Sequence, residues 1–124
     1  RVDVHWTVTV YAENYVTGDG VLHLANLLKT GGGSSNLAVK YVGLDVSNTN
    51  MVDEKWKSGT TSIVAYNAYK VTAEWDITAQ GKVLKVFLDN SDQTNYFAVA
   101  NIDDIPLENG DRIVVTWKVV VASS

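Results

Sequence analysis

The sequence contains no cysteine, so it has no disulfide framework, no thiolate nucleophile and no cysteine-ligated zinc. Basic residues are also few. The chain has 10 Lys and Arg against 14 Asp and Glu, and no basic stripe replaces the counterions of a phosphate backbone. No apolar run approaches the ~18 residues that span a bilayer. We therefore expect no nucleic-acid partner and no membrane insertion, and a stability that comes from packing and oligomerisation.

The size and composition of the chain are those of one β-rich domain. Its 124 residues are 46% apolar and 19% charged, and this length is large enough for a real core. A small share of charge, with abundant Thr, Val, Asn and Gly, is typical of a β-protein with much buried or interfacial surface. We predict a single domain over residues 1–124. Because the chain begins with Arg1 rather than Met, we also expect that upstream residues were cleaved or excluded from the numbering.

Two similar strands are predicted at the ends of the chain, over residues 2–10 and 113–121. Both alternate with the two-residue period of a strand, and their β-branched residues suit a pleated, half-buried surface. The apolar rows are Val2, Val4, Trp6, Val8 and Val10, and Ile113, Val115, Trp117, Val119 and Val121. Because the two strands have equal length, we expect them to pair within the subunit. The alternative is donation of the first strand to a neighbouring subunit.

Between these strands the sequence predicts one short helix over Val21–Lys29 and several further strands. Asp19 is expected to cap the helix and Gly31 to end it, and its apolar stripe is Val21, Leu24, Leu27 and Leu28. Further strands are predicted over residues 37–46, 63–77, 83–88 and 96–102, with a hairpin-type turn at residues 78–81. The predicted fold is an all-β sandwich or jelly-roll-like domain of six to seven strands with one short helix.

No set of residues predicts catalysis or a cofactor. The two histidines, His5 and His23, have no Ser, Cys or carboxylate at a catalytic spacing. Acidic residues cluster at Asp89 and Asp92 and again over residues 103–111. Loop carboxylates of this kind can bind calcium, but Asp is also selected by turns and the spacing matches no EF-hand. We predict a protein that is not an enzyme and binds no cofactor or metal.

The tryptophans are the candidates for an interface or for recognition. Trp6 and Trp117 lie in register with aliphatic residues on strand faces, which favours a core or subunit-interface position. Trp56 lies in the long polar connection over residues 47–61, between Lys55 and Lys57. It is therefore the tryptophan most open to recognition, for example in stacking on a sugar.

Several segments resemble small tail-fibre and virion structural proteins of tailed phages and prophages. In that family a short helix ends in glycines, a strand of the Tyr-Ile-Ala-Leu-Gly type follows, and the chain closes with a hydrophobic segment containing Thr and Trp. The matching segments here are residues 21–33, 40–45, 86–90, 97–101 and 108–119. The resemblance implies a virion component, present in many copies, whose role is assembly or attachment.

The leading hypothesis is therefore a structural protein of a virus particle, either a tail, fibre or capsid-decorating subunit, that acts as a homo-oligomer. Its expected partners are copies of itself and other virion proteins, with a host-surface glycan as a further candidate. The alternatives are an extracellular filament or pilus subunit assembled by strand donation, and a carbohydrate-binding module. The expected location is the virion, or the cell surface for the filament.

Overall fold

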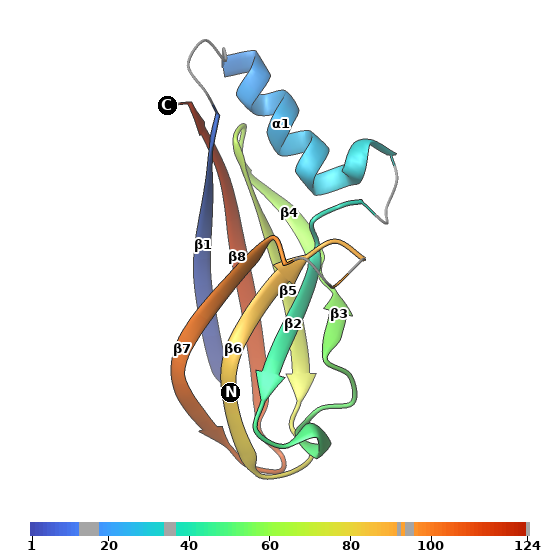
Figure 1. Ribbon diagram of the computed structural model, residues 1–124, viewed down its shortest axis with the longest axis vertical. Coiled ribbons are helices and arrows are strands. Elements are labelled where there is room, and N and C mark those ends of the chain that lie inside the picture. The colour runs from blue at the N-terminus through green and yellow to red at the C-terminus, as the bar shows by residue number, and fades with distance from the viewer. Residues whose placement is uncertain (13–17, 34–36, 92, 94–95, 124) are drawn as a thin grey trace.

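The structure is a computed structural model that describes residues 1–12, 18–33, 37–91, 93 and 96–123. In these segments eight strands form two sheets of four, with one α-helix at one end (Figure 1). The first sheet has the order β1 (Val2–Ala12), β8 (Arg112–Ser123), β5 (Ala68–Asp76), β4 (Thr60–Ala65). The second has the order β3 (Trp56–Ser58), β2 (Tyr41–Val46), β6 (Gly81–Asp89), β7 (Ala98–Leu107). The predicted all-β sandwich is confirmed, with eight strands rather than six to seven.

The two end strands of the chain pair with each other, as predicted. β1 runs parallel to β8 in unbroken register from Val2 opposite Ile113 to Ala12 opposite Ser123, and Trp6 lies opposite Trp117. The other strand pairs of the described chain are antiparallel. Because β8 also pairs with β5, it is a central strand, whereas β1 forms an edge of the sheet.

The core lies between the two sheets and consists of the apolar rows that alternation predicts. Trp75 and Tyr69 of β5 are almost fully buried. Their polar atoms are paired, since Trp75 Nε1 donates to the Glu54 carbonyl at 2.8 Å and the Tyr69 hydroxyl donates to the Val39 carbonyl at 2.9 Å. Burial of an aromatic side chain of this kind requires such a partner for its polar end. These two bonds also tie β5 of the first sheet to the segments that precede β2 and β3 of the second sheet.

Helix α1 (Gly18–Thr30) covers the end of the first sheet where the strands of the second sheet do not reach (Figure 1). It begins three residues before the prediction, so Asp19 lies in its first turn and is not its N-cap. It ends at Thr30, one residue beyond the prediction, and is followed by Gly31, the residue expected to end it, whose φ of 66° explains the glycine. The buried face is made by Val21 and Ala25, which pack on Val121 of β8.

Three local predictions are wrong. The predicted strand 37–46 begins only at Tyr41, because residues 37–40 turn back toward the helix and the Val39 amide donates to the Leu28 carbonyl. The long strand 63–77 is divided into β4 and β5 by a turn at Tyr66 and Asn67. Residues 78–81 do not form a hairpin turn, since they carry the chain from β5 to β6 in the other sheet. The predicted strand 96–102 does form, as β7, but its bounds differ, since β7 begins at Ala98 and ends at Leu107.

Candidate assembly surfaces

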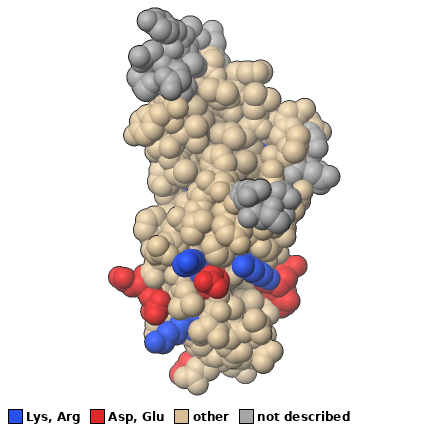
Figure 2. All heavy atoms as spheres, viewed as in Figure 1, with Lys and Arg blue, Asp and Glu red and all other residues tan. Residues whose placement is uncertain are grey.

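Charge is distributed unevenly over the molecule. On the face shown in Figure 2, the Lys, Arg, Asp and Glu side chains lie in the lower half, and the described part of the upper half shows none. The charged half contains exposed ion pairs such as Arg112 with Asp76, at 2.9 Å. The upper half holds α1 and the tip of the β4–β5 hairpin (Figure 1). Lys29 of α1 also belongs to this half, but on the face shown the described surface around the helix carries no charge, a pattern typical of an interface.

Exposed apolar side chains occur at this same end. We call this surface the apolar end, and it consists of Leu22, Leu24, Leu27, Ile63 and Tyr66. Leu22 of α1 is 38% exposed, and Ile63 of β4 and Tyr66 in the following turn are 69% and 62% exposed. They surround a small hollow of about 40 Å³ between the helix and the hairpin, with Lys29 at its margin. Leu24 and Leu27, on the other flank of α1, are 36% and 41% exposed and belong to the same end.

The exposure of Leu24 and Leu27 contradicts the predicted apolar stripe. The helix packs through Val21, Ala25 and Leu28, spaced by four and three residues, so Leu24 and Leu27 are rotated away from the sheet. The sequence analysis also missed Ile63 and Tyr66 as surface residues. A signal was present in the uncharged run Ile63–Tyr66, where apolar residues follow each other without alternation.

A groove opens along the side of the sandwich where β1 and β7 are the edges of their sheets. Its volume is about 600 Å³, and its described walls are residues 6–9 of β1 and residues 97–101. Trp117 also lines it, but its side chain is only 2% exposed, so Trp117 is a core residue. Its indole Nε1 is buried and has no hydrogen-bond partner in the described structure. A buried donor of this kind is uncommon and calls for a physical explanation.

Trp6 lies on the predicted inner side of β1 but is 39% exposed. β1 is an edge strand, so a side chain on its inner face has a neighbouring strand on one side alone and opens onto the groove. The prediction of an inward row is therefore correct for Val4, which is buried, and only partly correct for Trp6. As an exposed aromatic beside an open groove, Trp6 remains the best placed of the three tryptophans for contact with a partner.

Trp56 is in β3 rather than in a polar loop, and it lies on the outer face of the second sheet. Its ring is 5.7 Å from that of Phe87 and 5.6 Å from that of Tyr96, and the latter two rings are 4.5 Å apart. Gly43 of β2 leaves room for the indole, since a Cβ there would be 2.8 Å from Trp56 Cε3. Lys55 lies over the Phe87 ring, with Nζ at 5.0 Å from its centroid. The rings pack on one another and do not form a flat, open sugar platform.

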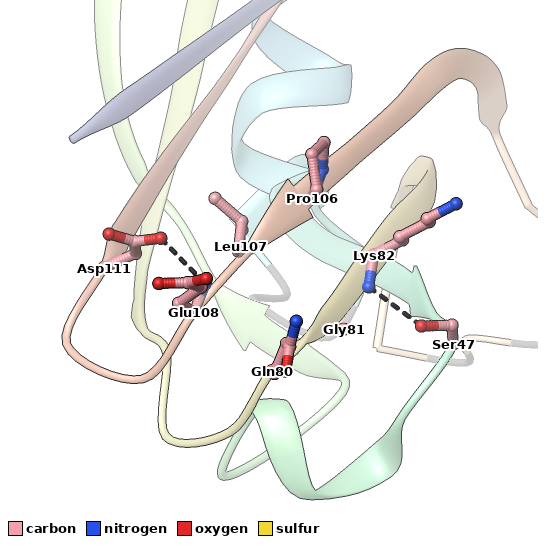
Figure 3. Close-up of a pocket in the computed structure, with 8 residues that line it drawn as sticks. All are labelled: Ser47, Gln80, Gly81, Lys82, Pro106, Leu107, Glu108 and Asp111. Carbon is pink, nitrogen blue, oxygen red and sulfur yellow. Dashed lines mark hydrogen bonds between the residues drawn. The ribbon is translucent and has the colours of Figure 1, made fainter.

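The largest hollow, of about 770 Å³, lies at the charged end (Figure 3). Two of its polar side chains bond to nearby backbone. Ser47 Oγ accepts from the Lys82 amide and Asp111 Oδ2 accepts from the Glu108 amide, both at 2.8 Å. In Figure 3 the side chains of Lys82 and of the two carboxylates point in different directions. This hollow therefore contains no convergent group of acid, base and nucleophile.

The other candidate residues are not brought together. His5 and His23 are both exposed, on β1 and α1. Within the described residues, no group of three or more His, Asp or Glu is arranged to hold a metal ion. Asp92, part of one acidic cluster, lies outside the described residues. The expectation of no metal and no enzymatic activity stays a prediction.

Comparison with known proteins gives no match to a protein-family model, to a curated protein or to a solved structure. The resemblance to phage tail-fibre and virion proteins therefore stays a prediction from short motifs. Among the described helices, none is both long enough and apolar enough to cross a membrane.

Proposed function

We propose that this chain is a non-enzymatic structural subunit that acts by assembling with copies of itself, in a virus particle or in an extracellular filament. The observation that carries the proposal is the apolar end, where exposed aliphatic and aromatic side chains surround a hollow that has one charged residue, Lys29, at its margin. Monomeric proteins expose few contiguous apolar surfaces of this kind, and the larger ones are usually functional.

The apolar end can contribute several kcal/mol to association. Complete burial of one large apolar side chain is worth ~1.5–3 kcal/mol. Leu22, Ile63 and Tyr66 already lose part of their accessible surface in the monomer, so we count about half of that value, or roughly 2–4.5 kcal/mol for the three per subunit. An interface between two copies doubles this contribution, against the cost of lost rotational and translational freedom.

Of the two kinds of assembly, we propose the virus particle first, because the motif resemblance supports a tail, fibre or capsid-decorating subunit. The extracellular filament is the second candidate, supported by β1, a terminal strand at a sheet edge. A carbohydrate-binding module is less well supported, because the aromatic cluster around Trp56 is packed on itself.

The test measures the molecular mass of the purified protein in solution as a function of its concentration. We expect the wild-type chain to form oligomers between 1 and 100 µM, on the order of the affinities of ordinary protein interfaces, in light scattering and native mass spectrometry. Ile63→Asp should weaken the assembly, because it places a charge at the centre of the apolar end. Thr60→Asp, an exposed position of the same strand outside the hollow, is the matched control and should assemble like the wild type. A wild-type chain that stays monomeric over the whole range would contradict the proposal.

A further inference from the structure

The four sheet edges of the sandwich differ in how well they are protected against pairing. β3 has only three residues, and β4 has six with an irregular register near its end. β7 carries Asp103, Asp104 and Pro106 and also a break in register. Short strands, charges, prolines and bulges are the features by which edges avoid pairing with other chains. β1 has none of them from Val4 to Ala12, and its register with β8 is unbroken.

We propose that the free edge of β1 pairs antiparallel with β1 of a second copy, across a two-fold axis at Thr7. The inference rests on the proposed function and names one interface of that assembly. β1 runs from Val2 to Ala12, so residue 7 is its midpoint and this register uses the whole length of both strands. The two first sheets then form one continuous sheet of eight strands.

The side-chain pattern agrees with this register. In an antiparallel pair centred on residue 7, Trp6 lies opposite Val8 of the partner subunit and Val8 lies opposite Trp6 of the partner subunit. All four side chains belong to the inner row of β1, so the inner face of one sheet continues as the inner face of the other. A shift by one residue would place inner side chains against outer ones. Pairs of an aromatic and a β-branched residue are among the favourable cross-strand pairs.

The groove beside β1 identifies the second copy as the occupant. All its lining residues are uncharged, in a chain that is 19% charged. The matching partner is therefore an uncharged, proline-free strand about as long as β1. Residues 4–12 of a second β1 supply it, since the segment contains no Lys, Arg, Asp, Glu, Pro or Gly. A two-fold axis makes the same strand complementary to itself.

The exposure of the groove residues points to a covering partner. Trp6 is 39% exposed although it is on the inner face, and Val99 on β7 is 48% exposed. A strand added to β1 lies along the mouth of the groove, and Trp6 and Val8 of the partner subunit then cover it. The buried indole N–H of Trp117, which has no partner in the described structure, is beneath this region. The β1 strand of a second copy would bring further hydrogen-bond acceptors there.

The first test uses one charge on each edge of the same sheet. Thr7 and Ser62 are both exposed, on β1 and β4 respectively, and each lies opposite a lysine of the next strand, Lys118 or Lys70. Thr7→Glu places two glutamates directly opposite each other across the axis, and like charges in that position are destabilising. We expect this variant to raise the dissociation constant of the β1 dimer roughly two- to fivefold. Ser62→Glu should leave it unchanged, and both variants should melt like the wild type.

The second test uses the absence of cysteine. A single Thr7→Cys gives two thiols on facing positions of the paired strands, where Cβ atoms are about 4.5–5.5 Å apart, close to the geometry of a disulfide. We expect mild oxidation to convert Thr7→Cys into a covalent dimer and to leave Ser62→Cys mostly monomeric. Equal crosslinking of the two variants would overturn the inference, as would association of Thr7→Glu at the wild-type concentration.

The two proposals fail in different ways. If Ile63→Asp abolishes higher assembly while Thr7→Cys still crosslinks, the apolar end and the β1 edge are separate interfaces, and both proposals stand. If the wild type forms oligomers that depend on Ile63 but Thr7→Cys does not crosslink, the inference about β1 is wrong. The proposed role as an assembling structural subunit still stands in that case.

Discussion

Removal of residues 1–10 tests how much of the sandwich depends on its first strand. These residues form almost all of β1 and cover one side of β8. Val4 is 8% exposed, and Val2, Val8 and Val10 are partly buried against the core. Complete burial of one aliphatic side chain is worth ~1.5–3 kcal/mol. We count Val4 in full and the others at about half, which gives roughly 4–8 kcal/mol.

This loss is comparable to the whole net stability of a small domain, about 5–15 kcal/mol. We therefore expect the chain of residues 11–124 to be largely unfolded in water at 25 °C, as measured by far-UV circular dichroism and urea titration. A free peptide of residues 1–12 should restore the folded spectrum with one peptide bound per chain. A truncated chain that unfolds at the same urea concentration as the full chain would refute the reasoning.

The peptide allows a matched control, because neighbouring positions face opposite sides of the sheet. A peptide with Val4→Asp should fail to restore the fold, since it places a carboxylate in the core. A peptide with His5→Asp should restore it, because His5 is exposed on the outer face. Equal rescue by the two peptides would mean that β1 does not bind in the register observed here.

Two further predictions concern single buried contacts. Tyr69→Phe should lower the free energy of unfolding by about 1–3 kcal/mol in urea titrations, because it leaves the buried Val39 carbonyl unpaired. Burial also raises the pKa of Tyr69 above its ordinary value of 10.0. The unfolded chain therefore loses this proton first, and the stability of the wild type should fall as pH rises above 10. An equally steep fall in the stability of Tyr69→Phe would contradict this assignment. Gly43→Ala should cost about 1–3 kcal/mol by crowding the Trp56 ring. The cost should largely disappear in a Trp56→Ala background, and an unchanged cost there would show that the crowding has another source.

The sequence predicted the local features that depend on alternation. The buried row of β8, with Ile113 and Trp117, and the pairing of the two end strands follow from period-two patterns and equal lengths. The fold class followed as well. The partial exposure of Trp6 could not be predicted in this way, because it depends on β1 being an edge strand. Alternation along a strand is the same at the edge and at the centre of a sheet.

The remaining errors also depend on distant contacts. The turn at residues 78–81 has the composition of a hairpin, but whether two consecutive strands pair or cross to the other sheet is decided by how both sheets pack. Trp56 seemed to lie in a polar loop because β3 has only three residues, and its ring is held by Gly43 and Phe87 from other strands. The apolar end was missed because it combines a helix flank with a hairpin tip that lies about 40 residues later in the sequence.

The pairing of the first strand with the last has a consequence for biosynthesis. β1 leaves the ribosome before the other described strands, and its partner β8 follows only after about 110 residues, or roughly 5–20 s at ordinary rates of translation. During that interval β1 lacks its neighbouring strand β8, and its uncharged stretch from Val4 to Ala12 has to remain soluble or be held by another molecule. On a polysome the nearest completed β8 can belong to a neighbouring nascent chain. Local concentration during synthesis, and not only concentration after release, is therefore expected to influence whether β1 closes its own sandwich or that of another copy.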